Sequence, residues 1–184
     1  MSQPPEEAPR WQTYPGEPGA QPAADPPLPV GPLPPVPVPT GPGGLGRPGY
    51  HPNDPLVLAA GGDGLKKESA WTAPPYLSLR GDLGSIRLDF RRAEVVSQVI
   101  WMQVSGGMGS IVIILPEGWA AQLDRLAPSW GSRKSTVAEQ PVGNNPVLVL
   151  TGSMGMGSLQ VRYPTRADER RLQRLIRKEQ KKLR

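Results

Sequence analysis

The chain has no cysteine, and only one histidine and one phenylalanine among its 184 residues. Without cysteine there can be no disulfide, thiolate nucleophile, iron–sulfur cluster or cysteine-bound zinc. His51 stands in proline-rich sequence without a second histidine, so neither a catalytic triad nor a histidine metal site can form around it. The carboxylates between residues 82 and 139 are scattered. We therefore expect no enzymatic activity, no cofactor and no small-molecule substrate.

Long apolar runs are also missing. No fully apolar run exceeds five residues, as in 111–115, whereas a membrane-spanning helix needs about 20. The start, MSQPPEEAPRW, has neither the basic nor the apolar region of a secretory signal. These features predict a soluble, cytoplasmic protein, in which a peripheral contact with a membrane is still allowed.

The positive charge is concentrated at one end of the chain. Residues 166–184 hold nine Lys/Arg and three Asp/Glu, a net of +6, whereas the whole chain carries +5. The remaining residues therefore have a net charge of −1. The basic character belongs to a C-terminal segment rather than to a basic domain.

Proline dominates the first third of the sequence. Residues 1–55 contain 18 of the 25 prolines and few large apolar residues in periodic order. Such a segment buries too little apolar surface to offset the entropy lost on folding. We predict a disordered arm over 1–55, stiffest in the polyproline stretch 26–42, and a linker over 56–75, within which 56–60 is either a first short strand or docked linker. The stretch has the PxxP spacing of ligands for SH3-type grooves, but no basic residue flanks it closely. This absence favours a spacer over a ligand.

The middle of the chain has the alternation of β-strands. In 86–90 apolar side chains alternate with Arg87 and Asp89, which is typical of a strand with one buried face. Residues 111–115 are apolar throughout and indicate a strand covered on both faces, and 146–152 is strand-like. Residues 119–126 fit a helical turn or a strand. The pattern predicts an all-β domain over 76–164.

Gly-Ser doublets punctuate this domain at spacings of 25, 22 and 26 residues. Stacked β-coils produce repeats of this length, in which glycine allows a positive φ at each corner and a close approach of neighbouring backbones. The pattern favours a small β-solenoid-like domain, and an antiparallel meander or sandwich is the alternative. The turn residues assigned to stacking are Gly84, Ser85, Gly109, Ser110, Gly157 and Ser158.

The glycine clusters do not form a nucleotide site. No lysine follows any of them as a phosphate-binding loop requires, and 155–157 lacks the third glycine of a dinucleotide fingerprint. Each predicted strand also follows its cluster directly, so no helix N-terminus is available to a phosphate.

The last segment, 165–184, has the period of an amphipathic helix. Thr165 is a predicted N-cap followed by acidic residues in the first turn. Leucines 172, 175 and 183 with Ile176 form a narrow apolar stripe, which favours packing against the open end of the β domain. The basic residues predict a second role, contact with an anionic membrane or nucleic acid. These candidates are Arg170, Arg171, Arg174, Arg177, Lys178, Lys181 and Lys182.

The segments GDLGSIRLDF, GSIVIILPEG and GSMGMGSLQV resemble the C-terminal domain of bacterial cell-wall-active-antibiotics response proteins. Each pairs a glycine turn with a β-branched or leucine-rich strand, and the similarity covers nearly half of the chain. The resemblance implies a β-solenoid-like fold and a non-catalytic role in sensing envelope stress. It carries over no binding residues, because the shared positions are structural.

The sequence thus predicts a non-enzymatic interaction or regulatory module with a protein partner. Self-association through stacked coils is a further expectation, since an uncapped coil end exposes pairing groups. The alternative is an accessory binder of nucleic acid or an anionic membrane surface through residues 166–184.

Overall fold

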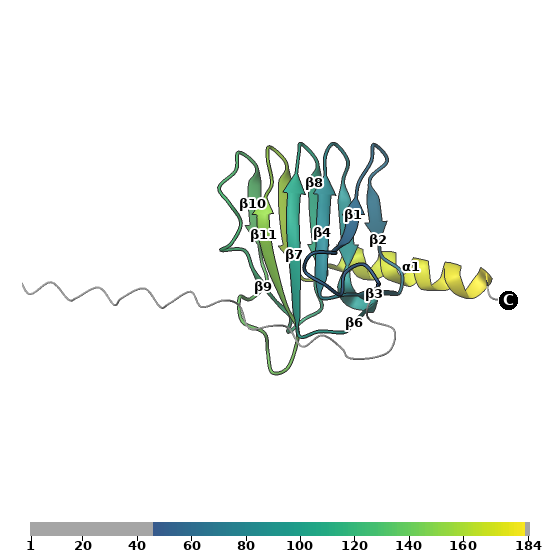
Figure 1. The fold of residues 1–184 in the computed structure, drawn as a ribbon. Helices are drawn as coiled ribbons and strands as arrows, with labels where there is room; N and C mark the ends of the chain where they lie inside the picture. The colour runs from purple at the N-terminus through teal and green to yellow at the C-terminus, as the bar shows by residue number, and fades with distance from the viewer. Residues whose placement is uncertain (1–45, 183–184) are drawn as a thin grey trace, which may run out of the picture. The chain divides into compact units, whose positions relative to one another are not determined.

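The computed structural model describes residues 46–182, in which strands predominate and one α-helix closes the chain (Figure 1). Most of the predicted arm lies outside the described residues. In chain order the elements are β1 Leu56–Ala59, β2 Leu65–Lys67, β3 Trp71–Ala73, β4 Tyr76–Gly81, β5 Ile86–Asp89, the 3-10 helix η1 Phe90–Arg92, β6 Ala93–Val95, β7 Val99–Gly106, β8 Ser110–Ile114, β9 Ala120–Gln122, β10 Ser132–Ser135, β11 Val147–Ser153, β12 Ser158–Arg162 and α1 Arg166–Lys182.

The strands form parallel sheets. One five-stranded sheet has the order β1-β4-β7-β11-β9, a second has the order β10-β12-β8-β5-β2, and β3 pairs with β6. Every pairing between these strands is parallel. The all-β prediction for the domain is confirmed, and the antiparallel alternative is wrong for the described strands.

Each turn joins a strand of the first sheet to a strand of the second, and we call two strands joined in this way a strand pair. The last two strand pairs, β9–β10 and β11–β12, are stacked in the reverse of their order in the chain. β11 and β12 lie between β7–β8 and β9–β10, although β9 and β10 come first in the sequence (Figure 1). The amino-acid sequence explains this placement. β10 reads SRKS and is exposed at all four residues, whereas β11 begins VLVL and buries three of them. Polar strands suit a sheet edge, and apolar strands suit the interior.

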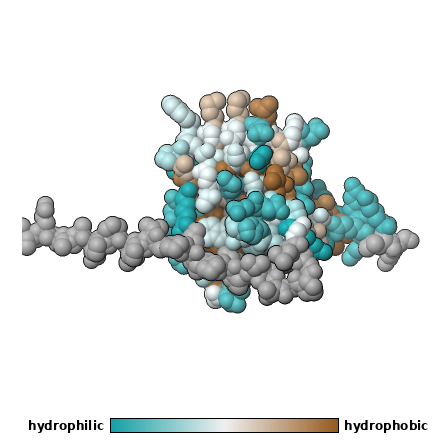
Figure 2. Space-filling view, viewed as in Figure 1, coloured by the Kyte–Doolittle hydropathy of each residue, from teal (hydrophilic) through white to brown (hydrophobic). Residues whose placement is uncertain are grey.

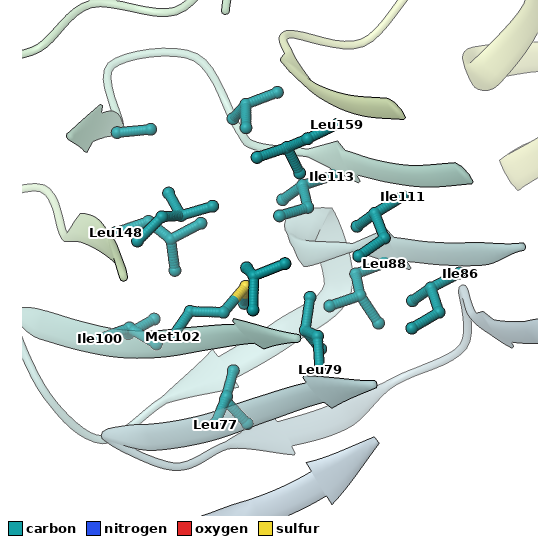
Figure 3. Packing of buried hydrophobic residues seen from close by; sticks show 14 of the residues in the cluster. Leu77, Leu79, Ile86, Leu88, Ile100, Met102, Ile111, Ile113, Leu148 and Leu159 are labelled. Carbon is teal, nitrogen blue, oxygen red and sulfur yellow. The ribbon is translucent and has the colours of Figure 1, made fainter. Parts of the chain in front are cut away.

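The hydrophobic core lies between the two five-stranded sheets (Figure 3). Matching side chains stack from strand to strand, as in Leu77, Met102 and Leu150 of the first sheet. The second sheet aligns Ile86, Ile111 and Leu159 in the same way. All six of these side chains are at most 1% exposed. The two-residue alternation read from the sequence is therefore what directs these ladders inward.

A column of glycines joins the turns between the sheets. A Cβ placed on Gly84, Gly109, Gly157 or Gly131 would lie 2.0–2.1 Å from the carbonyl oxygen of the next glycine in the stack. The column ends at Gly61, whose carbonyl faces Gly84. None of these five glycines has a positive φ. Close backbone approach, rather than left-handed geometry, is therefore the reason that glycine stands at these turns.

Two predicted boundaries change. Of the two alternatives for 56–60, the structure has the short strand, β1. A linker is wrong for the rest of 56–75, because it contains β2 and β3, and all three strands pair with later strands. Alternation there is too short to recognise, since β2 and β3 have three residues each. The arm predicted to continue to residue 55 gives way to turns from residue 46, where Gly49 N–H donates to the Asp54 carbonyl at 2.6 Å.

Replacing a glycine inside the column tests this packing. We expect Gly109→Ala to lower the free energy of unfolding by about 1–3 kcal/mol, because the added methyl group overlaps the Gly84 carbonyl. Gly61→Ala is the matched control, since nothing lies within 4 Å of its Cβ position. Urea denaturation followed by circular dichroism measures both changes. Equal effects of the two substitutions would show that the column is not tightly packed.

Candidate functional site

The C-terminal helix begins at a capping box. The Thr165 backbone N–H donates to Asp168 Oδ2 at 2.7 Å, and the Thr165 hydroxyl donates to the same oxygen at 2.6 Å. In return Asp168 N–H donates to Thr165 Oγ1 at 3.4 Å. The predicted N-cap at Thr165 is confirmed. The acidic first turn and basic last turn suit the helix dipole.

Asp168 also anchors the helix to the second sheet. Its carboxylate pairs with Arg162 at the end of β12 and with Arg87 on β5. The side chain is only 4% exposed, so this carboxylate is held by charged partners away from water. Burial by itself would raise the pKa of Asp168, but the hydrogen bonds from Arg162 and Thr165 outweigh it and hold this pKa well below the ordinary value.

Further ion pairs connect the helix to the strands beneath it. Glu68, just after β2, accepts a hydrogen bond from Arg171 Nε at 3.0 Å. The same carboxylate lies 2.8 Å from Arg87 Nε. Toward its C-terminal end the helix is held by Glu179, which pairs with Arg92 of η1 at 2.8 Å. The helix thus crosses the strands of the second sheet and extends past β2 (Figure 1).

A second cluster supports the first turn of the helix. Arg91 donates to Asp89 and, at 3.0 Å, to Glu169 Oε1. Arg91 Nη2 also donates to the Asp168 carbonyl at 3.1 Å. The hydrogen bond with Asp89 raises the pKa of the Arg91 guanidinium above its usual value. Arg91 is therefore charged at neutral pH.

The apolar stripe has a smaller role than the sequence indicates. Leu172, Leu175 and Ile176 are half-buried, and none belongs to the hydrophobic core cluster. Leu183 lies outside the described residues. The expectation that the helix covers the open end of the β domain is wrong, because its partners lie on β12, β5 and η1 and just after β2. Ion pairs, rather than apolar packing on the core, determine where this helix lies.

The opposite side of the helix carries a line of cations. Five basic residues recur at intervals of three or four positions and fall within a sector of about 80° around the helix axis. All five are exposed, and within residues 46–182 no carboxylate lies within 4.0 Å of any of them. We call this set the basic strip: Arg166, Arg170, Arg174, Arg177 and Lys181.

The predicted anionic-surface residues divide between the two sides of the helix. Arg170, Arg174, Arg177 and Lys181 are in the basic strip, and Lys178 is exposed beside it. Arg171 faces the domain and pairs with Glu68, so it anchors the helix. Lys182 is exposed at the helix end. Arg166 is the additional member of the strip, which the four-residue step back from Arg170 could have indicated.

The predicted turn residues lie together but away from the helix. Gly84, Gly109 and Gly157 belong to the glycine column, and Ser110 and Ser158 are paired across β8 and β12. These turns lie at the top of the domain in Figure 1, whereas α1 begins at the opposite ends of the second-sheet strands. The column therefore packs the turns of the β domain together and contributes no side chain to the basic strip.

The described residues hold no group of three or more His, Cys, Asp or Glu side chains placed to bind a metal ion. Over the same residues, no helix combines the length and apolar character that crossing a membrane requires.

Neither a family model, nor a curated protein, nor a solved structure matches this chain. The resemblance to cell-wall-active-antibiotics response proteins stays a prediction from the sequence.

Removing the charge of Asp168 tests how the helix is held. We expect Asp168→Asn to cost about 3–5 kcal/mol of unfolding free energy, because Arg87 and Arg162 lose their shared buried partner. Glu169→Gln is the control, since Glu169 is 56% exposed and, among residues 46–182, pairs only with Arg91. Chemical denaturation monitored at the tryptophans gives both values. Similar costs for the two variants would contradict an anchoring role for Asp168.

The lowered pKa of Asp168 also predicts a dependence on pH. A carboxyl whose pKa is lower in the folded protein contributes stability above its ordinary pKa of about 3.9 and loses it as the pH falls further. We expect the stability gap between wild type and Asp168→Asn to narrow between pH 5 and pH 2. The difference between the urea midpoints of the two proteins, measured across this range, tests this expectation. The other carboxyls titrate in both proteins, so their effect cancels in the difference. A constant gap would contradict the assignment.

Proposed function

We propose that the described strands wind as a small β-solenoid-like domain. Five strand pairs, β1–β2, β4–β5, β7–β8, β11–β12 and β9–β10, follow one another in the same order in both sheets, which supports this interpretation. The glycine column supports it independently, because it repeats one turn geometry at each step of the stack. Such a domain gives a firm platform on which a helix can be fixed in one orientation.

We further propose that the chain is a non-enzymatic interaction module whose basic strip binds the phosphate backbone of a nucleic acid. The observation that carries this proposal is the division of the helix into an anchored side and a cationic side. The strip extends over about 22 Å from Arg166 to Lys181, at 1.5 Å per residue. Cations spaced by one helical turn can each meet a phosphate and release counterions.

The composition of the strip favours phosphate over a membrane interior. Four of its five members are arginines, whose planar guanidinium groups bind phosphate oxygens in pairs. A helix that inserts into a membrane interface needs an accessible apolar side. Here the apolar residues Leu172 and Leu175 lie on the same side as Asp168, which is buried against the sheet. A purely electrostatic contact is therefore the interaction that this helix can make without leaving the domain.

A regulatory role in envelope stress is the second candidate. It comes from the resemblance, and the recurring glycine turns before the strands favour it, since the similarity rests on that pattern. The partner in that case is a protein. A pull-down with the intact chain that recovers a sensor kinase at salt concentrations that abolish nucleic-acid binding would support this second role.

Neutralising part of the strip tests the nucleic-acid proposal. We expect Arg170→Gln/Arg174→Gln/Arg177→Gln to weaken binding to a 20-base-pair duplex at least tenfold at 50 mM salt. The slope of log affinity against log salt should fall by about 3, one unit for each arginine that no longer neutralises a phosphate. Fluorescence anisotropy with a labelled duplex measures both quantities. The three arginines make no ion pair with the described residues, so folding should be unaffected.

A charge-matched variant separates the strip from the overall charge. Arg47→Gln/Lys66→Gln/Arg80→Gln removes three exposed charges that lie outside the helix and should change binding less than twofold. Equal losses of affinity in the two triple variants would reject the strip as the binding surface. Failure to bind a duplex, together with binding to vesicles containing phosphatidylglycerol, would replace the nucleic acid by an anionic membrane.

A further inference from the structure

A row of exposed apolar side chains crosses the top of the domain. Leu83, Met108, Met156 and Trp130 are 76%, 64%, 67% and 95% exposed. Each directly precedes a member of the glycine column: Gly84, Gly109, Gly157 and Gly131. We call these four side chains the apolar ridge. Figure 2 shows brown and tan residues along the top of the domain, where Figure 1 draws these turns.

The packing beneath the ridge fixes the spacing of its members. Met108 N–H donates to the Asp82 carbonyl at 2.8 Å, and Met156 N–H donates to the Gly107 carbonyl at 2.9 Å. Leu83, Met108 and Met156 therefore follow the strand spacing of about 4.8 Å. Trp130 continues the row because Gly131, the next residue, stacks on Gly157. Four large apolar side chains in one line form a contiguous exposed patch, and patches of this kind mark interaction sites on soluble domains. Methionine at the two central positions suits a contact that must adapt its packing.

Charge is distributed unevenly along the ridge. The five turns 61–64, 81–85, 106–110, 154–158 and 128–132 contain only two charged residues, Asp63 and Asp82. Both acids lie at the Leu83 end. Lys66 and Arg80 are on the flanking strands at this end, and Lys66 lies at the same level of the second sheet as Lys134. The difference between the two ends is therefore the pair of acids in the turns. At the other end, the edge strand β10 follows Trp130. It carries two cations, Arg133 and Lys134, and no acid.

This distribution makes the ridge complementary to itself when it is reversed. We propose that the apolar ridge is a homodimer interface, in which a second copy of the chain lies ridge to ridge in the antiparallel direction. Leu83 of one copy then faces Trp130 of the other, and Met108 faces Met156. The acidic end of each copy meets the cations of β10. Asp82 also provides an acceptor for the indole N–H of Trp130, which needs one when it is buried.

A twofold axis across the ridge produces this arrangement, and it uses one surface twice. A parallel arrangement would instead place Asp63 and Asp82 of the two copies together at the tips of the turns, which electrostatic repulsion opposes. The proposed contact lies at the opposite end of the domain from the start of α1. It therefore leaves the basic strip accessible and does not depend on the proposed nucleic-acid binding. A dimer would present two strips, so that a long polyanion could bind both.

Sedimentation of the intact chain over a range of concentrations tests the interface. We expect a reversible dimer, and Met108→Ser/Met156→Ser should raise its dissociation constant at least tenfold. Val142→Ser is the matched control, because Val142 is 68% exposed and lies outside the five turns. Circular dichroism confirms that both proteins are folded. A strictly monomeric wild type, or a dimer that both variants weaken equally, would overturn the proposal.

Chemical cross-linking tests the direction of pairing. The chain has no cysteine, so Ser85→Cys and Ser132→Cys each introduce one thiol beside opposite ends of the ridge. A short bismaleimide should join the two variants when they are mixed, whereas each variant alone places its thiols about 14 Å apart, three strand spacings. Cross-linked self-dimers of each variant alone, without a cross-link between the two variants in the mixture, would reject the antiparallel arrangement.

Lipid is the remaining alternative for an exposed apolar row. Phosphatidylcholine vesicles test it without the contribution of charge. Binding of wild-type monomer that Met108→Ser/Met156→Ser abolishes would assign the ridge to a membrane and overturn the homodimer. The absence of vesicle binding, together with a concentration-dependent dimer, is the result that we expect.

Discussion

The contact between a turn glycine and the carbonyl oxygen of the next turn sets the spacing of the whole domain. Wherever the glycines stack, the strands that follow them are held in register, and their apolar residues meet as ladders in the core. The same contact leaves no room for a side chain at the glycine itself. The residue just before it must then point outward, so one constraint produces both the packed core and the apolar ridge.

The helix depends on this platform in a different way. Its first turn is held by a carboxylate that combines a helix cap with two arginines from separate strands, Arg87 and Arg162. Those arginines are brought together only because β5, β8 and β12 are neighbours in the second sheet. Because buried ion pairs are directional, they fix the rotation of the helix about its axis as well as its position. That rotation is what turns the basic strip outward.

Much of the fold could be predicted from the sequence, because strand alternation and helix periodicity are local. The buried strand at 111–115, the helix from 166 and its Thr165 cap are examples. The order of the strand pairs could not be predicted in this way. Gly-Ser doublets recur evenly along the chain, and nothing in their spacing indicates that 157 lies between 109 and 131. The exposure of β10 carries that information, yet polar strands are easily taken for loops.

The candidate site was only partly accessible to sequence reasoning. The composition shows that the helix is basic. It does not show that Arg171 anchors the helix while its neighbours face solvent, because that depends on the position of Glu68 just after β2. Arg87 has the alternation of an outward, solvent-facing residue, and its role as a helix anchor follows from tertiary structure alone. The apolar ridge cannot be predicted from the sequence, because isolated methionines in glycine-rich turns have no periodicity until the turns are stacked.

The arrangement of the glycine column is the claim on which the platform, the helix and the ridge all depend. Nuclear Overhauser contacts among selectively labelled glycines test it most directly. Short contacts should connect Gly157 with both Gly109 and Gly131, with none between Gly109 and Gly131. A direct contact between Gly109 and Gly131 would place the strand pairs in chain order and contradict this account.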